Sequence, residues 1–125
     1  AVLKAKEDIK APEPPKHEEE TKIFTVVEQM PLFPGGDAAL MAYLRDNIHY
    51  PTVAAENGVQ GRVVVGFVVE RDGSITDVNV LRSVDPSLDR EAMRVVKGMP
   101  RWTPGKQNGS AVRVKYQVPV TFRLQ

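Results

Sequence analysis

The chain has 125 residues, including ten prolines and nine glycines but no cysteine, and its net charge is +1. The missing cysteine excludes disulfide bonds and thiolate metal sites. No apolar run approaches the roughly 20 residues that span a bilayer, and no signal segment is apparent. The mixed charges argue against a dedicated nucleic-acid binder. With 42% hydrophobic residues the chain can build a core, so we expect a soluble binding domain.

Residues 1–22 differ in composition from the rest. The stretch APEPPKHEEETK contains three prolines, four glutamates and two lysines, and almost nothing apolar. Such a segment cannot bury enough surface to offset the entropy of ordering it. We therefore predict a flexible linker over residues 1–22 and a folded domain over residues 23–125. His17 beside Glu18–Glu20 suggests a metal site, but linker composition explains these residues better, and no metal ligand is predicted.

The first elements follow from breaks in the pattern. Residues 23–28 (IFTVVE) are rich in β-branched side chains and predict a short strand. Asp37 is a favourable helix cap, and apolar residues recur every four positions after it, which predicts a helix ending before Tyr50. The apolar stripe of this helix is Leu40, Leu44 and Ile48. Pro51 opens a short helical turn that Asn57-Gly58 stops.

From Val59 the apolar period changes to two. Residues 59–70 predict a strand, residues 71–74 (RDGS) a hairpin turn, and residues 75–83 the return strand. Asp85-Pro86 then begins a second helix, which Pro100 ends. After it, we expect a compact corner at Trp102, Pro104 and Gly105, followed by a turn at Asn108-Gly109.

Residues 112–124 show the clearest alternation. The even-numbered residues are apolar, and the odd-numbered residues are mostly polar or charged. One buried and one exposed face are typical of an antiparallel sheet covered on one side. We predict an α+β fold: a small three- to four-stranded antiparallel sheet with two helices on one face. A right-handed crossover is easiest if the last strand lies beside residues 59–70.

Pro119 predicts that this last strand lies at an edge of the sheet. Proline has no N–H, and within sheets it is confined to edges and bulges. The odd-numbered residues would then direct their N–H and C=O groups toward the open side. An open edge invites a partner strand. Alternatively, Arg113, Lys115 and Arg123 simply protect the edge against aggregation, and the pattern leaves both interpretations open.

Signals for catalysis are weak. The two histidines are His17, in the linker, and His49, and no GxSxG, GxGxxG or Walker sequence occurs. Asp72 and Asp77 flank a hairpin tip, where carboxylates are usually only solvated. We predict that the chain is not an enzyme and carries no cofactor.

Three segments together carry a resemblance to a known family. They are PLFPGGDAALMAYLRDNIHYP, AAENGVQGRVVVGFVVERDGSITDVNVLRSVDPSLDREAMRVV and MPRWTPGKQNGSAVRVKYQVPVTFRL. Their most specific patterns are GxVxVxFxVxxDGxI, LDxEAxRVV and WxPGxxNG. Over residues 30–124 the chain resembles the C-terminal domain family of TonB, the energy transducer of Gram-negative envelopes, in its Bacteroidetes-type form.

The resemblance implies a function. Such domains lie in the periplasm, joined to an inner-membrane anchor by a proline-rich linker. They bind the N-terminal TonB box of an outer-membrane transporter by strand addition. They pass on work that the ExbB–ExbD complex derives from the proton-motive force. The anchor is absent from this chain, and residues 1–22 would be the end of the linker.

The resemblance also implies two groups of partner-binding residues. The family's TonB-box contact is its last strand, here Val112, Arg113, Val114, Lys115, Tyr116, Gln117, Val118, Pro119 and Val120. The family's YP motif corresponds to Tyr50-Pro51 with its neighbours Ile48 and His49. Because Pro119 removes a donor, pairing should concentrate on residues 113–117.

Two other roles remain open. Domains of this kind also form periplasmic tails of membrane sensor or peptidase proteins, where the tail binds a partner without transmitting force. The chain could instead be a structural module in which the last strand pairs with its own copy. An isolated fragment is especially prone to such dimerisation, so the homodimer stays an expectation for this chain.

Overall fold

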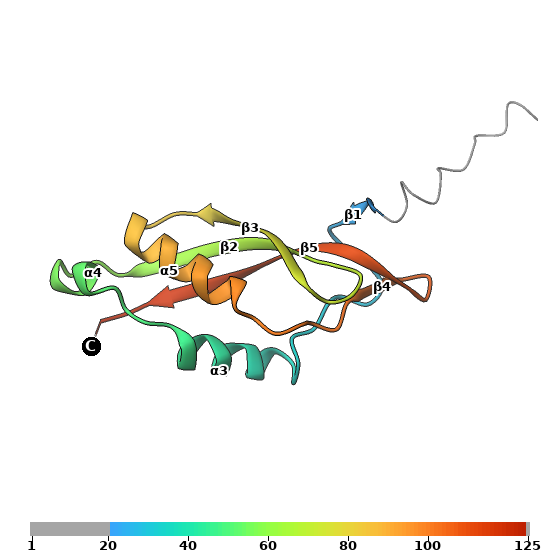
Figure 1. The fold of residues 1–125 in the computed structure, drawn as a ribbon, viewed down its shortest axis with the longest axis horizontal. Helices are drawn as coiled ribbons and strands as arrows, with labels where there is room; N and C mark the ends of the chain where they lie inside the picture. Colours follow the sequence, from blue (N-terminus) through green and yellow to red (C-terminus); the bar gives the residue numbers. More distant parts are fainter. Residues whose placement is uncertain (1–20, 125) are drawn as a thin grey trace, which may run out of the picture.

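The computed structural model describes residues 21–124, so the linker prediction falls almost entirely outside the described residues. The fold is α+β, as predicted (Figure 1). The strands and helices follow in the order β1 (Ile23–Phe24), α3 (Asp37–Asn47), α4 (Thr52–Glu56), β2 (Gly61–Val69), β3 (Ile75–Arg82), α5 (Pro86–Lys97), β4 (Gly105–Gln107) and β5 (Ser110–Phe122).

The sheet is built around the pair β2 and β5. The strand order is β1-β5-β2-β3, and β4 pairs with β5 outside this path. Every residue of β2 lies opposite a residue of β5, from Gly61 with Phe122 to Val69 with Val114, without a register shift. This antiparallel ladder confirms the prediction that the last strand lies beside residues 59–70 rather than beside β3.

The first strand differs from the prediction in length and direction. Only Ile23 and Phe24 form a strand, and they pair in parallel with Arg113 and Val114. The sheet is therefore mixed, not purely antiparallel. The strand ends early because Val27 turns into the interior, where 7% of its surface stays exposed. Gln29 then forms a bridge with Lys106.

The predicted corner at residues 102–105 continues into a strand that the sequence did not indicate. β4 forms a hairpin with β5, and Asn108 and Gly109 supply positive φ values of 53° and 80° at its turn. Gly105 permits the close approach, since a Cβ there would lie 2.6 Å from Val114 Cγ2. A three-residue strand beginning with glycine has too little apolar alternation to be predicted.

The helices are positioned as expected, with one local difference. Asp85 caps α5, and its carboxylate accepts a hydrogen bond of 3.0 Å from the Ser87 N–H. In α3 the cap position is held by Gly36, so Asp37 is the first helical residue and not the cap. Its negative carboxylate still lies in the first turn, where it interacts favourably with the positive end of the helix dipole.

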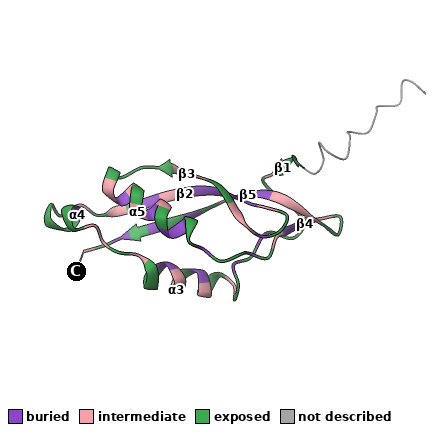
Figure 2. Ribbon diagram, in the orientation of Figure 1, coloured by how far each residue is buried: buried purple, intermediate pink, exposed green. Residues whose placement is uncertain are grey.

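The core lies between the sheet and the helices (Figure 2). It contains Val63, Val65, Phe67 and Val69 of β2, Val118, Val120 and Phe122 of β5, Leu40 and Leu44 of α3, and Leu88, Ala92, Val95 and Val96 of α5. Trp102 packs edge-on against three other rings, with centroid distances of 5.2 Å to Tyr116, 5.4 Å to Phe67 and 5.7 Å to Phe33. The alternation along β2 and β5 thus decides which face is buried.

Candidate functional site

The edge of β5 is open over only part of its length. Residues 110–112 pair with β4, and Arg113 and Val114 pair with β1. Beyond them, no strand among residues 21–124 pairs with the far side of β5. The predicted open edge is therefore correct for the second part of β5 and wrong for Val112, Arg113 and Val114. The hairpin neighbour β4 covers Val112, and β1, about 90 positions earlier in the sequence, covers Arg113 and Val114.

The nine residues of the predicted binding stretch differ in how far their side chains are buried. Val114, Val118 and Val120 are buried, with 0–2% of their surface exposed, so their side chains belong to the core. The side chains of Lys115, Gln117 and Pro119 are exposed, whereas Val112, Arg113 and Tyr116 are half-buried. A partner strand would thus meet backbone groups and the odd-numbered side chains.

The register with β2 supports the expected direction of the free backbone groups. Pro119 lies opposite Val64 within the uninterrupted ladder. A residue without an N–H fits there if its backbone groups point away from β2. Because backbone direction alternates along a strand, the odd-numbered Gln117 has the same backbone direction as Pro119. Lys115 is also odd-numbered, so both offer backbone groups to the open side.

Arg113 of β5 joins Glu70, which directly follows β2, and the start of the described chain. Its guanidinium donates to both carboxylate oxygens of Glu70, at 2.8 and 3.1 Å, and to the Thr21 carbonyl at 2.6 Å. Thr76 also donates to the Glu70 carboxylate. The hydrogen bond from Arg113 is the main cause that lowers the pKa of Glu70. Such a paired, half-buried carboxylate orients Arg113 along the sheet.

Glu70→Gln should make unfolding less sensitive to acid. The lowered pKa of Glu70 means that its ionised form stabilises the fold above pH 4.5, the ordinary value. This contribution is lost as the pH falls through the folded-state pKa. At pH 7 the variant should lose about 1–3 kcal/mol of unfolding free energy, whereas the difference from the parent chain should shrink as Glu70 of the parent becomes protonated at lower pH. Urea unfolding at pH 7 and pH 3 measures both values, and a pH-independent difference would contradict the prediction.

The YP segment, Ile48–Pro51, lies at the C-terminal end of β5. The Tyr50 ring packs edge-on against Phe122 at a centroid distance of 5.6 Å. Its hydroxyl donates a hydrogen bond to the Val59 carbonyl. These contacts fix the Tyr50 side chain between β5 and the segment that follows α4. Tyr50 therefore contacts β5 at Phe122, two residues beyond the predicted stretch 112–120.

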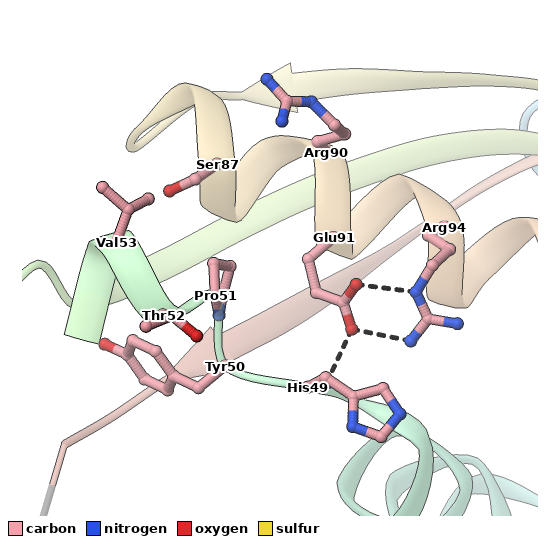
Figure 3. A pocket seen from close by; sticks show the side chains of 9 residues that line it. All are labelled: His49, Tyr50, Pro51, Thr52, Val53, Ser87, Arg90, Glu91 and Arg94. Atoms are coloured by element: carbon pink, nitrogen blue, oxygen red, sulfur yellow. Dashed lines mark hydrogen bonds and ion pairs between the residues drawn. The ribbon is translucent and has the colours of Figure 1, made fainter. Parts of the chain in front are cut away.

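A shallow cleft of about 470 Å³ opens beside the YP segment (Figure 3). The residues that line it are His49, Tyr50, Pro51, Thr52, Val53, Ser87, Arg90, Glu91 and Arg94. The Glu91 carboxylate accepts a hydrogen bond of 2.7 Å from the backbone N–H of His49 and two hydrogen bonds of 2.7 Å from the Arg94 guanidinium. Arg94 is the main cause that lowers the pKa of Glu91. The cleft is therefore lined by an ionised pair, Glu91 and Arg94, and both residues belong to α5.

The described residues offer no metal site. Within residues 21–124, no group of three His, Asp or Glu side chains gathers closely enough to hold an ion. The suggested cluster of His17 and Glu18–Glu20 lies outside this range. No helix in the same range is long and apolar enough to cross a membrane.

Sequence reasoning missed the contacts that hold the site together. Arg94 donates a hydrogen bond of 2.9 Å to the Asn47 carbonyl. It also pairs with Glu91, which accepts a hydrogen bond from the backbone N–H of His49, 42 positions earlier in the sequence. The spacing of Glu91 and Arg94 suggests a pair on one helix, but it does not reveal which backbone the pair meets. The pairing of β1 with Arg113 could not be predicted either, because a strand of two residues is too short to show an alternating pattern.

Comparison with known proteins gives consistent matches. The family model described as "Gram-negative bacterial TonB protein C-terminal" matches residues 46–124. A protein TonB of Helicobacter pylori is 29% identical over 77 residues, which are 61% of this chain and 26% of that protein. A protein TonB of Pseudomonas aeruginosa is 43% identical over 76 residues, 61% of this chain and 22% of that protein. In fold, the chain is similar to the solution structure of H. pylori TonB-CTD, with a TM-score of 0.55, 22% identity, and coverage of 69% of this chain and 78% of that one.

Proposed function

Since this chain belongs to the Gram-negative TonB C-terminal domain family, we propose that it is the partner-binding part of a TonB-type energy transducer. The chain spans about a quarter of the length of the curated relatives it matches. In this proposal it acts in the periplasm as part of an inner-membrane-anchored protein. ExbB–ExbD would supply the work through the anchor, and the domain would deliver it to an outer-membrane transporter. The role is mechanical, and no catalysed reaction is assigned to it.

The observation that carries the proposal is the unpaired side of β5 beyond Val114. A TonB-box segment of a transporter would add there as a further strand, so that backbone hydrogen bonds supply most of the contact. The exposed side chains of Lys115, Gln117 and Pro119 lie on the solvent-facing side of β5 next to this edge. Because backbone pairing carries little sequence information, one domain can serve several transporters.

The YP segment would provide a second contact. The cleft beside it is lined by Tyr50, which contacts Phe122 of β5, and it presents Arg90 and Arg94 beside Glu91, which pairs with Arg94. Arg90 is exposed on α5. A transporter segment leaving β5 at Phe122 would pass Tyr50 and could place polar or acidic groups in this cleft. In this proposal Ile48, His49, Tyr50 and Pro51 form this second contact with the transporter.

A titration followed by backbone amide NMR tests the proposal. Peptides copied from the N-terminal segments of TonB-dependent transporters are added to the ¹⁵N-labelled chain. The largest shifts should fall on residues 115–120 and around Tyr50, with smaller changes in α3. Peptides with the same composition in scrambled order are the control. If the chain is folded and monomeric but no transporter peptide moves these amides, the proposed partner is wrong.

The open side of β5 also favours a second candidate, self-pairing of two copies. Light scattering over a range of concentrations distinguishes the two. A monomer that binds peptide supports the transducer, whereas a stable dimer that excludes peptide supports the structural module. A folded monomer that binds no transporter peptide would instead favour the tail of a membrane sensor or peptidase protein.

A further inference from the structure

The open edge that the proposed function assigns to a transporter strand ends where β5 already pairs with a strand of the same chain. β1 lies in parallel against β5, with Ile23 opposite Arg113 and Phe24 opposite Val114. Figure 1 shows β1 at the end of the sheet where β4 also meets β5. β1 thus pairs with two of the nine residues in the predicted binding stretch, beside Val112, which pairs with β4.

The contacts that hold β1 are few and lie near the surface. The strand has two residues, and Ile23 keeps 40% of its surface exposed. Lys22 lies over the Phe24 ring, 4.9 Å from its centroid, and Arg113 donates to the Thr21 carbonyl at 2.6 Å. Exposed contacts of this kind contribute little individually. A strand pair this short is not stable by itself.

The segment after β1 is held independently and much more firmly. Val27 and Pro31 are buried. Gln29 exchanges backbone hydrogen bonds of 3.1 and 2.8 Å with Lys106, and Leu32 exchanges bonds of 3.0 and 2.8 Å with Thr103. Between the two parts, Val26 is 79% exposed. β1 can therefore leave the sheet while the chain from Val27 onward stays in place.

We propose that β1 is an internal occupant of the β5 edge, which the transporter strand must displace before it can pair with Arg113 and Val114. This regulation rests on the proposed function. Arg113 would keep its pair with Glu70 and exchange the Thr21 carbonyl for a carbonyl of the incoming strand. Because only the fraction of molecules with β1 released can pair along the whole edge, β1 lowers the apparent affinity by that fraction.

Two variants of the full chain test this inference in opposite directions. In the released variant, Ile23→Gly and Phe24→Gly remove the side chains of β1 and favour its unpaired state. In the locked variant, Ile23→Cys and Arg113→Cys place two thiols on directly opposed residues, within reach of a disulfide. The chain has no other cysteine, so this is the only disulfide that oxidation can form within one molecule, and a monomeric mass under non-reducing conditions identifies it. Each variant's fold is checked by its amide spectrum.

Each variant has a matched control. Thr25→Gly with Val26→Gly introduces the same two glycines at the next two positions, which are exposed and belong to no strand. For the locked variant, the reduced form of the same protein is the control, so the loss of the Arg113 side chain affects both sides of the comparison equally. The probe throughout is a synthetic TonB-box peptide copied from a transporter, and the measurement is its dissociation constant.

The released variant should bind the peptide at least threefold more tightly than the parent chain, and its glycine control should bind like the parent. Oxidation of the locked variant should weaken binding at least tenfold relative to its reduced form. Equal affinities of the parent, released and oxidised locked proteins would overturn the role of β1 while leaving the proposed function intact. Absence of binding in all forms, including the released one, would overturn both.

Discussion

Gln117→Pro is expected to leave the domain folded and to weaken binding of a TonB-box peptide at least tenfold. Gln117 has the same backbone direction as Pro119, which the ladder with β2 already accommodates opposite Val64. The change would remove one free N–H and place a ring where the added strand must approach. A lost backbone hydrogen bond contributes about 0.5–1.5 kcal/mol, and the ring adds a steric cost. Together these reach the 1.4 kcal/mol of a tenfold change.

Gln117→Ala is the matched control, because it removes the same side chain and keeps the backbone donor. It should bind peptide within about twofold of the parent chain, since a tenfold change would require about 1.4 kcal/mol from side-chain contacts. Isothermal titration gives the affinities, and amide spectra show whether each variant is folded. Equal losses for the proline and alanine variants would mean that the partner recognises the Gln117 side chain and not the strand edge.

The second large effect is expected at the hairpin tip between β2 and β3. Gly73 has φ 87°, and its carbonyl accepts a hydrogen bond of 2.8 Å from the backbone N–H of Trp102. A Cβ at this position would lie 2.0 Å from the Trp102 carbonyl oxygen. Gly73→Ala therefore combines an unfavourable φ with a backbone collision, and it should cost about 3 kcal/mol or more. For a domain of this size the melting temperature should fall by more than about 10 °C.

Gly109→Ala separates the two causes. Gly109 also has a positive φ, 80°, but a Cβ there would meet nothing within 4 Å. Its substitution should cost only about 1 kcal/mol, from backbone conformation alone. Thermal denaturation followed by circular dichroism compares the two variants directly. If both lose the same stability, the close approach of the hairpin tip to Trp102 contributes nothing, and the expected collision is wrong.

Periodic patterns predicted the fold well where segments were long enough to have a period. Residues 59–70 and 112–124 gave the ladder of β2 and β5, because alternation identifies the buried face. The same argument could not predict β1 or β4, which have two and three residues. β1 pairs with residues 90 positions away, and β4 depends on Gly105, whose missing Cβ lets it lie close to Val114.

The candidate site shows the same division. Pro119 alone predicted both the edge and the direction of its backbone groups, since missing an N–H is a local property. That Arg113 is joined to Glu70, and His49 to Glu91, could not be predicted, because each pair lies more than 40 positions apart in sequence. The YP segment was identified only through the family resemblance. Its contact with Phe122 is a property of the assembled fold.

The aromatic cluster around Trp102 gives the domain an intrinsic optical signal. Trp102 is the sole tryptophan of the chain, and 3% of its surface is exposed. Its ring lies 5.2 Å from that of Tyr116, which sits in the middle of the predicted binding stretch of β5. A strand that pairs with β5 and shifts Tyr116 would alter the surroundings of the indole ring. Its fluorescence would then report binding to the edge without any added label.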